Sequence, residues 1–207
     1  MQQTPCRDLV LFFTSLALCV NAVGLRAQVP ITSSADPIAK LTSNDLPNFH
    51  QVSAALYRSG QPTRAGMEHL KASGITTIIN LRSFSSDRDE IGTTGLAYEH
   101  IYMKAWHPEE KEAIRFLQIV TDAKRTPVLV HCHYGSDRTG AMVALYRIAV
   151  QCWTKDDAIR EMREGGFGFN AIWFNLPWWL DSLDIAALRA QSGILIGPPR
   201  PPTPAAL

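Results

Sequence analysis

The sequence predicts an α/β protein with a mainly parallel central sheet flanked by helices and a helical C-terminal part. Between residues 55 and 149, short β-branched and aliphatic segments alternate with amphipathic helical segments, which is typical of a parallel sheet with crossover helices. Residues 75–82 and 127–132 are rich in Ile, Val, Leu and Thr, as expected for strands buried on both faces. After residue 149 only helical patterns follow, so we expect the sheet to be complete by then.

The first predicted strand, residues 55–58, is followed by a turn containing glycine and proline and then by a helix at residues 64–73. Thr63 precedes this helix, and its hydroxyl is suited to accept a hydrogen bond from the first helical turn. Gly74 follows the helix and ends it, because glycine readily adopts the left-handed backbone found at that position. The second predicted strand, residues 75–82, comes next.

The following unit begins with a polar loop at residues 83–90 and a third strand at residues 97–103. A helix is predicted over residues 108–123, because Pro108 and two glutamates stand where a helix N-terminus favours them. Apolar residues then recur along this segment at helical spacing. The fourth strand, residues 127–132, completes the predicted sheet.

Three helical segments are predicted after the fourth strand, at residues 138–149, 155–164 and 171–191. The second segment starts at Thr154 or Lys155, and Gly165 with Gly166 ends it. Pro177 is expected to interrupt the third segment. We expect the aromatic cluster of this segment to pack in the core, because a membrane-surface helix would carry a basic face. The cluster consists of Trp173, Phe174, Trp178 and Trp179.

The N-terminal residues differ in composition from the rest of the chain. Residues 9–20 contain no charge, follow Arg7 and precede small residues, a pattern typical of a secretory signal peptide cleaved after Ala22 or Ala27. A transmembrane span needs about 20 apolar residues, so a retained membrane anchor is the less favoured alternative. We expect four regions: a signal peptide at 1–27, a linker or N-terminal arm at 28–50, the folded domain at 51–192, and a proline-rich disordered tail at 193–207.

The remaining composition indicates one globular domain with free cysteines. The formal charge of +1 speaks against a general nucleic-acid binder. Only Cys132 and Cys152 lie outside the predicted signal peptide. The helix expected between them spans roughly 20 Å at 1.5 Å per residue, whereas a disulfide needs Cα atoms within about 7 Å. We therefore expect two free thiols, with Cys152 buried as a small apolar residue.

Residues 131–140, HCHYGSDRTG, combine side chains that can bind and attack a phosphate ester. Cys132 ends the fourth strand, and ligands of open α/β sheets bind beyond the carboxyl ends of strands. The loop leads into a helix N-terminus, whose unpaired amides and dipole favour an anion, and Gly135 permits the tight curl. Arg138 can place two parallel hydrogen bonds on a phosphate group. The helix N-terminus and the arginine also favour the thiolate of Cys132, the form that attacks phosphorus.

This segment resembles the His-Cys, five residues, Arg-Thr/Ser signature of cysteine-dependent protein tyrosine phosphatases and dual-specificity phosphatases. A wider resemblance, carried by LYRSGQP, INLR and AIREMREGGFGF and covering about residues 52–190, is to bacterial dual-specificity-like phosphatases related to the plant and fungal atypical group. It implies a phosphotyrosine-phosphatase-like fold, a phosphocysteine intermediate, no metal, no cofactor, and a general acid on a separate loop.

Each residue of the motif has an expected role. Cys132 is the nucleophile, and Arg138 binds and stabilises the phosphoryl group. The Thr139 hydroxyl steadies the departing thiolate, and His131 points away from the ligand and orders the loop by hydrogen bonds. The phosphate-binding loop comprises His133, Tyr134, Gly135, Ser136, Asp137 and Arg138.

The general acid is where this sequence departs from the family pattern. The family usually has an aspartate on a loop before the nucleophile strand, but the corresponding MKAWHPEEKE contains none. Asp137 is the favoured substitute, since myotubularin-type and Sac-type phosphatases have an aspartate at that loop position. Glu109 is the second candidate and His107 the third. A general acid must be positioned at the leaving group, with a pKa near the working pH.

Other classes of site fit the motif less well. His131 and Cys132 face opposite sides of a strand, and a structural zinc needs four ligands at separated spacings, so we expect no metal. A phosphate-binding module without turnover and a rhodanese-type sulfur carrier also use such loops. The Arg-Thr-Gly start of the helix speaks against the sulfur carrier.

We therefore predict a phosphoric monoester hydrolase for phosphotyrosine or mixed phosphoprotein substrates. Inositol-phosphate and lipid phosphatases of this superfamily often place lysines in the loop, where this chain offers only His133 as an extra cation. An inositol-phosphate phosphatase and a catalytically weak phosphate-binding module are the alternatives. We expect a monomer whose partner is a phosphorylated protein or small molecule, with no nucleic acid. It is expected to be exported to the periplasm or secreted, or else membrane-anchored by an uncleaved N-terminal segment.

Overall fold

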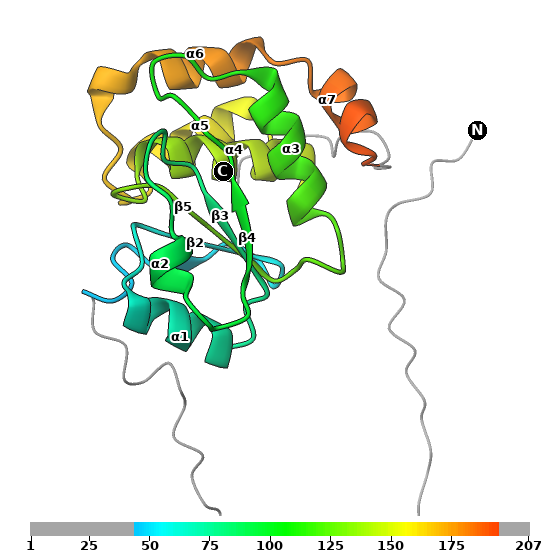
Figure 1. Ribbon diagram of the computed structural model, residues 1–207. Coiled ribbons are helices and arrows are strands. Elements are labelled where there is room, and N and C mark those ends of the chain that lie inside the picture. Colours follow the sequence, from blue (N-terminus) through cyan, green and yellow to red (C-terminus); the bar gives the residue numbers. More distant parts are fainter. Residues whose placement is uncertain (1–43, 195–207) are drawn as a thin grey trace, which may run out of the picture. The chain divides into compact units, whose positions relative to one another are not determined.

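A computed structural model describes residues 44–194, which form three layers with a five-stranded sheet in the middle (Figure 1). The strand order is β1-β2-β5-β3-β4. The pairs β2–β5, β5–β3 and β3–β4 are parallel, and β1 runs antiparallel to β2 at one edge. The predicted fold class, a mainly parallel sheet flanked by helices, is therefore confirmed. The strands are β1 (His50–Gln51), β2 (Leu56–Ser59), β3 (Thr77–Asn80), β4 (Ala97–His100) and β5 (Val128–His131).

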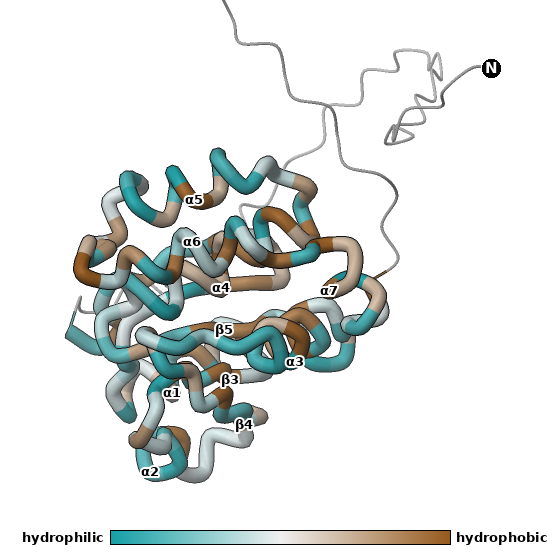
Figure 2. The backbone as a smooth tube through the Cα atoms, turned by 90° about the horizontal axis from the view of Figure 1, so that it is seen from above, coloured by the Kyte–Doolittle hydropathy of each residue, from teal (hydrophilic) through white to brown (hydrophobic). Residues whose placement is uncertain are grey.

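The helices cover both faces of the sheet. Short α1 and α2 lie on one face, and α3, α4 and the C-terminal helices lie on the other, with α5 and α6 outside α4 (Figures 1 and 2). Within residues 44–194, no helix has the length and apolar run needed to cross a membrane. The helices are α1 (Arg64–Ala72), α2 (Arg88–Ile91), α3 (Glu110–Val120), α4 (Asp137–Ala149), α5 (Lys155–Glu164), α6 (Asn175–Ser182) and α7 (Ile185–Ser192), with a 3₁₀ turn at Ala171–Trp173.

The central strand β5 places the site. All four of its residues are buried, because it lies between β2 and β3 and helices cover both faces of the sheet (Figure 1). Parallel strands end at the same edge of a sheet, so the segments that follow β2 and β3 lie beside Cys132. The helix α4 that follows the loop is also largely buried.

Residues 44–50 differ from the sequence prediction, which assigned them to the N-terminal arm. Leu46 is only 5% exposed and belongs to the core on the α1 side of the sheet. The Thr63 amide donates to the Asp45 carbonyl, and β1 pairs with β2. Phe49 also packs against this cluster. Two apolar residues inside a polar stretch give no periodic pattern, which is why the sequence did not reveal their packing. The predicted signal peptide, most of the arm and most of the tail lie outside the described residues.

Pro177 does not interrupt its helix as predicted. It is the third residue of α6, where the backbone N–H has no partner inside the helix, so its absence costs little. The break occurs after Ser182 instead. There Asp184 caps α7, because its Oδ1 accepts a hydrogen bond from the Ala187 amide at 3.0 Å.

The aromatic cluster divides between core and surface. Trp173 and Trp179 pack against the core, whereas Trp178 and Phe174 are 70% and 59% exposed. The expectation that all four lie in the core is therefore wrong for two of them. The helical turns of 171–182 turn only one side of the segment toward α4.

Cys132 and Cys152, the cysteines within residues 44–194, are both free thiols, as predicted. Cys132 is buried, but Cys152 is only half-buried, which corrects the expectation that it lies in the core. Cys152 follows α4 in the left-handed backbone region, at φ +59°. Its sulfur contacts Arg189 Nη2 at 3.7 Å.

Candidate active site

The loop from Cys132 to α4 curls tightly against the turn that follows β2. Gly135 has φ +73°, and a Cβ on it would lie 2.5 Å from both Ser59 C and Gly60 N. Those are backbone atoms that cannot move aside cheaply, so only glycine fits here. The approach of this turn therefore fixes the curl that the sequence predicted.

The carbonyl groups of the loop are held from behind, and its amides are left unpaired. Three successive carbonyls accept hydrogen bonds: His133 O from Gln61 N at 3.0 Å, Tyr134 O from Asn48 Nδ2 at 3.1 Å, and Gly135 O from Arg58 Nη2 at 2.7 Å. Within residues 44–194 the structure has no acceptor for the amide N–H groups of 133–136. A run of free amides at a helix N-terminus suits a tetrahedral oxyanion.

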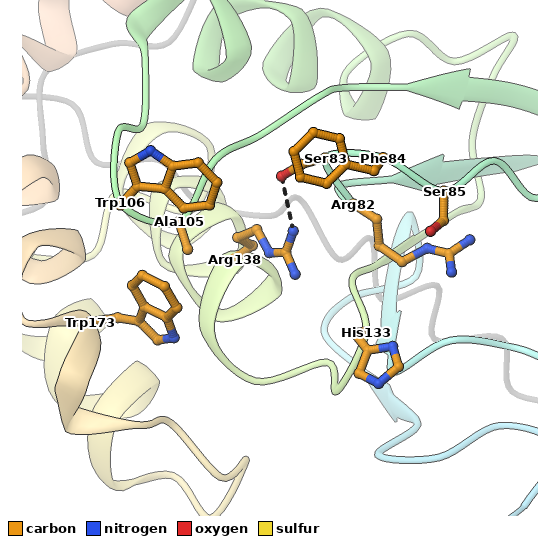
Figure 3. Close-up of a pocket in the computed structure, with 9 residues that line it drawn as sticks. All are labelled: Arg82, Ser83, Phe84, Ser85, Ala105, Trp106, His133, Arg138 and Trp173. Atoms are coloured by element: carbon orange, nitrogen blue, oxygen red, sulfur yellow. Dashed lines mark hydrogen bonds between the residues drawn. The ribbon is translucent and has the colours of Figure 1, made fainter.

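A cavity of about 290 Å³ lies at this loop, lined by residues 82–85, Ala105, Trp106, His133, Arg138 and Trp173 (Figure 3). Arg138 stands between the two tryptophans on one side and Arg82 with His133 on the other. Its Nη1 makes only long contacts, to Leu81 O at 3.4 Å and Ser83 Oγ at 3.5 Å. The guanidinium is thus available to a bound anion.

Aromatic side chains form the outer walls of the cavity. Phe84 and Trp106 are 87% and 58% exposed, and Trp173 is half-buried. Aromatic faces of this kind pack favourably against another ring. The cavity therefore combines cations with walls suited to an aryl group. Of the residues that line the cavity, only Arg138 and His133 were predicted from the sequence.

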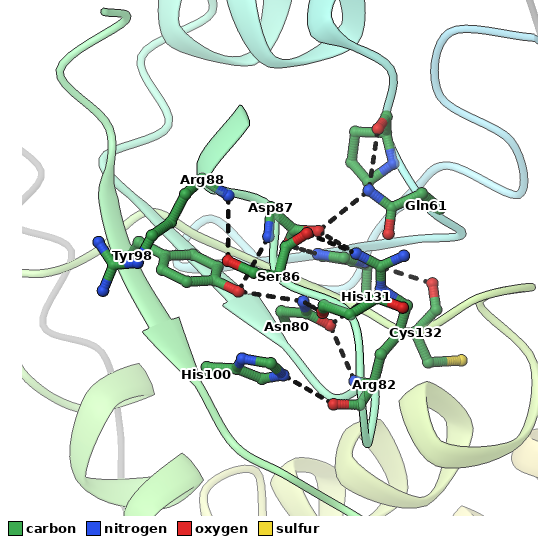
Figure 4. A network of polar contacts seen from close by, with 12 residues as sticks. Gln61, Asn80, Arg82, Ser86, Asp87, Arg88, Tyr98, His100, His131 and Cys132 are labelled. Carbon is green, nitrogen blue, oxygen red and sulfur yellow. Dashed lines mark hydrogen bonds and ion pairs between the residues drawn. The ribbon is translucent and has the colours of Figure 1, made fainter. Parts of the chain in front are cut away.

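A buried polar network lies behind the nucleophile (Figure 4). His131 and Asp87 are both 0% exposed, and His131 Nε2 lies 2.7 Å from Asp87 Oδ2. Asp87 Oδ1 also accepts hydrogen bonds from Arg82 Nη2 at 2.5 Å and Gln61 Nε2 at 3.1 Å. The other ring nitrogen of His131, Nδ1, lies 3.2 Å from Cys132 O. The network thus connects the strand before the nucleophile to Arg82 at the cavity.

Asp87 is a functional residue that the sequence did not single out. Burial alone would raise the pKa of Asp87, but hydrogen bonds from His131 and Gln61 and the charges of His131 and Arg82 outweigh burial and lower it. The carboxylate is therefore ionised at neutral pH. Asp87 lies in a polar stretch together with Asp89 and Glu90, and no sequence signal distinguishes it from these neighbours. The predicted loop in fact contains α2, and Asp87 stands at its start.

The two carboxylates considered as general acid have different surroundings. Asp137 is the first residue of α4, and its Oδ1 accepts from Asn170 N at 2.8 Å. Burial raises the pKa of Asp137, against smaller opposing effects of the Asn170 amide and Arg138. Glu109 caps α3, and a hydrogen bond from Lys111 at 2.6 Å lowers its pKa. Neither carboxylate lines the cavity, nor does the exposed His107.

The remaining motif side chains take different positions. Thr139 is 0% exposed, and its Oγ1 has no hydrogen-bond partner among the described residues. In particular, it forms no hydrogen bond with Cys132 Sγ. Tyr134 is 69% exposed and contacts the His133 ring edge to face. Ser136 is buried. Tyr134 and Ser136 therefore supply main-chain groups to the loop, and no three His, Cys, Asp or Glu side chains gather as a metal site in the described part of the chain.

A central parallel strand that ends in a buried cysteine, followed by such a loop and an arginine at the next helix, defines the class of cysteine-dependent phosphatases. The comparison with known families agrees. The chain belongs to the DSP-PTPase phosphatases, because residues 30–172 match the family described as "PTP-NADK: DSP-PTPase phosphatase fused to NAD+ Kinase". The resemblance inferred from the motif is thereby confirmed.

The relatives of the chain include a bacterial and a plant protein. It is 34% identical over 143 residues to the dual specificity protein phosphatase TpbA of Pseudomonas aeruginosa, a match that covers 69% of this chain and spans 65% of that relative's length. The Arabidopsis thaliana inositol diphosphatase DSP3 is 25% identical over 159 residues, covering 69% of this chain and 72% of that protein. A crystal structure of P. aeruginosa TpbA in complex with pTyr covers 74% of this chain and 93% of that chain, with 28% identity and a TM-score of 0.65.

Proposed function

We propose that this protein hydrolyses phosphoric monoesters through a phosphocysteine intermediate on Cys132, with phosphotyrosine or mixed phosphoprotein substrates. One observation carries the proposal: the loop that begins with Cys132 combines amides at 133–136 that have no acceptor among the described residues with the guanidinium of Arg138, which lines the cavity. Membership of the DSP-PTPase family supports it. No metal or cofactor takes part in the proposed reaction.

The chemistry proceeds in two displacements. The Cys132 thiolate attacks phosphorus, so that an S–P bond forms as the P–O bond to the leaving group breaks. Asp137 donates its proton to the leaving oxygen, for which the raised pKa suits it. Water then attacks the phosphocysteine and loses a proton to the Asp137 carboxylate, which releases phosphate and restores the thiolate. Arg138 and the loop amides stabilise the equatorial oxygens in both transition states.

The aromatic walls favour an aryl phosphate. Phe84, Trp106 and Trp173 can pack against the ring of phosphotyrosine, the ligand named for the TpbA complex. Arg82 supports a second candidate, an inositol-phosphate substrate. It adds to the cavity a cation that the phosphate loop itself does not supply. Its charge is paired with Asp87, so we favour the aryl substrate.

Trapping of the intermediate tests the proposal. With p-nitrophenyl phosphate, an acid-quenched reaction of the unaltered protein should retain phosphate on the chain, and Cys132→Ser should not. A sulfur carrier or a phosphate-binding module would release no p-nitrophenol. Substantial turnover in Cys132→Ala would refute Cys132 as nucleophile. A panel of phosphotyrosyl, phosphoseryl and inositol phosphates then separates the two substrate candidates.

We also propose that the chain is exported and acts as a monomer. The apolar run at residues 9–20 after Arg7 supports export. Cell fractionation and the N-terminal sequence of the mature protein test it, and light scattering tests the monomer. A cytosolic protein that keeps Met1 would contradict export.

A further inference from the structure

Arg58 on β2 is a buried arginine without a carboxylate partner. It is 1% exposed, and none of the ion pairs in residues 44–194 includes it. Its Nε has no hydrogen-bond partner among the described residues. Arginine is rarely this buried unless paired, because desolvation of a charge is costly. A fold that keeps such a residue must compensate the charge in some other way.

The guanidinium is directed at the back of the phosphate loop. Its Nη2 donates to Gly135 O at 2.7 Å, and its Cζ lies 3.9 Å from the centroid of the Phe167 ring. Phe167 is itself tied to the loop region, because its carbonyl accepts from Asn48 Nδ2 at 2.9 Å. A planar guanidinium stacks on an aromatic face in a way that an ammonium does not. Phe167 therefore holds the orientation in which Arg58 reaches the loop.

The side chain remains a cation at neutral pH. Burial lowers the pKa of Arg58 to about 10, with Arg147 acting in the same direction and Glu161 and Cys132 opposing it. Four groups interact electrostatically with Arg58: His50 on β1, Cys132 after β5, Arg147 on α4 and Glu161 on α5. Arg58 is therefore a buried positive charge beside the phosphate loop.

The bond to Gly135 has a consequence on the other side of the loop. The peptide between Gly135 and Ser136 is not among the cis bonds of the structure, and in a trans peptide the C=O and N–H groups point in opposite directions. A carbonyl held toward Arg58 therefore turns the Ser136 N–H away from Arg58. A cation on the carbonyl also polarises the peptide and strengthens its N–H as a donor.

We propose that Arg58 is a positioning residue of the phosphate loop, which holds the Gly135 carbonyl from behind, aims the Ser136 amide at the bound phosphoryl group, and supplies a buried positive charge that this dianion balances. The inference rests on the proposed phosphate site. It explains why a buried arginine without a paired carboxylate is retained: the bound oxyanion adds a counter-charge to that of Glu161, which acts on Arg58 without an ion pair.

Oxyanion binding tests the proposal without turnover. Full-length protein in a Cys132→Ser background, which lacks the nucleophilic thiol, is titrated with tungstate, a tetrahedral dianion, by calorimetry at pH 7.

Arg58→Met should weaken tungstate binding at least about tenfold. The matched control is Arg189→Met, because Arg189 also donates to main-chain carbonyls and forms no ion pair within residues 44–194, but it lies at the far end of α4, where it contacts Ala149, Ile148 and Cys152. The control should bind tungstate within about twofold of the background protein. Equal affinity in a folded Arg58→Met would overturn the proposal.

A second variant covers the case in which Arg58→Met does not fold. Arg58→Lys keeps the charge, but a buried lysine loses its proton at a lower pH than arginine does. Its tungstate affinity should therefore fall between pH 7 and pH 9, while Arg189→Lys and the background protein change little. If the tungstate affinity of Arg58→Lys changes with pH in the same way as that of the background protein, the proposal is overturned. A purely structural residue would cause no loss of affinity between pH 7 and pH 9. Absence of p-nitrophenol release by the unaltered protein would refute hydrolysis, while the tungstate result still decides the role of Arg58.

Discussion

Replacing Asp87 by asparagine is expected to destabilise the folded domain strongly. The carboxylate is 0% exposed and binds three side chains at once, His131, Arg82 and Gln61. Asparagine keeps the size of the side chain but offers one acceptor oxygen instead of two. Its NH₂ group then replaces either the oxygen that faces His131 or the oxygen that accepts from Arg82 and Gln61. Breaking one partner of a buried ion pair costs about 3–5 kcal/mol, because it leaves a charge buried without compensation.

This magnitude is a large part of the stability of a domain of this size. Typical domains are stable by about 5–15 kcal/mol. In a domain of about 150 residues, each 1 kcal/mol shifts the melting temperature by roughly 2–4 °C. Asp87→Asn should therefore lower the melting temperature by roughly 6–20 °C at pH 7.

The pH dependence gives a second measure of the same interaction. The pKa of Asp87 is lowered in the folded state, so its stabilisation is present above the unfolded pKa of about 3.9 and is lost as pH falls through the folded value. The difference between unaltered protein and Asp87→Asn should thus shrink below about pH 4.

Thermal unfolding followed by circular dichroism from pH 3 to pH 8 measures both effects. Asp157→Asn is the control, because Asp157 pairs with Arg160 on the surface, with side chains 48% and 61% exposed. It should leave the melting temperature nearly unchanged. If Asp87→Asn has the same melting temperature as the unaltered protein at pH 7, the buried network does not stabilise the fold as argued. The same conclusion follows if the difference between the two melting temperatures stays constant down to pH 3.

Four further predictions concern the catalytic loop. Arg138→Lys keeps the charge but loses the planar fork, so kcat/KM should fall at least about 100-fold, equivalent to roughly 2.7 kcal/mol; a value within fivefold of the unaltered protein would contradict bidentate binding. Asp137→Asn should slow hydrolysis of phenyl phosphate far more than that of p-nitrophenyl phosphate, because only the poorer leaving group needs the acid. It should also flatten the alkaline limb of the kcat profile, because activity that needs the protonated acid is lost as pH rises through the raised pKa of Asp137. Glu109→Gln should change neither property, and the reverse pattern would assign the acid to Glu109. Activity should survive EDTA, and loss on chelation with recovery on added zinc would revive a metal mechanism. Gly135→Ala should abolish phosphate trapping, since its Cβ would meet backbone atoms at 2.5 Å; near-normal trapping would show that the loop can relax.

These predictions separate residues that contact the phosphoryl group from residues that support the phosphate loop. Cys132 and Arg138 are expected to touch the phosphoryl group, so their loss should affect turnover more than stability. Asp87 lies behind the loop, and its loss should appear first in the melting temperature. Arg58 also lies behind the loop, but its effect should appear in oxyanion affinity. Measuring stability, binding and turnover on the same variants separates these roles.

Much of the architecture follows from the local pattern of residues. The four parallel strands could be predicted, because runs of β-branched residues stand between helical segments with clear caps. Thr63 caps α1, accepting from Gly66 N at 3.1 Å, and Thr154 caps α5, accepting from Asp157 N. The cysteine-arginine loop could also be located, since its spacing after a strand is a local property. Strand β1 and helix α2 were missed, because two and four residues give no periodic signal.

The sequence by itself thus determined the fold class, the position of the phosphate loop, and Cys132 and Arg138 as the residues on which its chemistry depends. Only the tertiary structure decided what surrounds them: Arg82, Phe84 and Trp106 at the cavity, and Arg58 and Asp87 behind the loop. The physical reason is that parallel strands bring segments distant in sequence to one edge of the sheet. Whether a charged side chain there is buried, paired or open to a ligand depends on neighbours that no local pattern specifies.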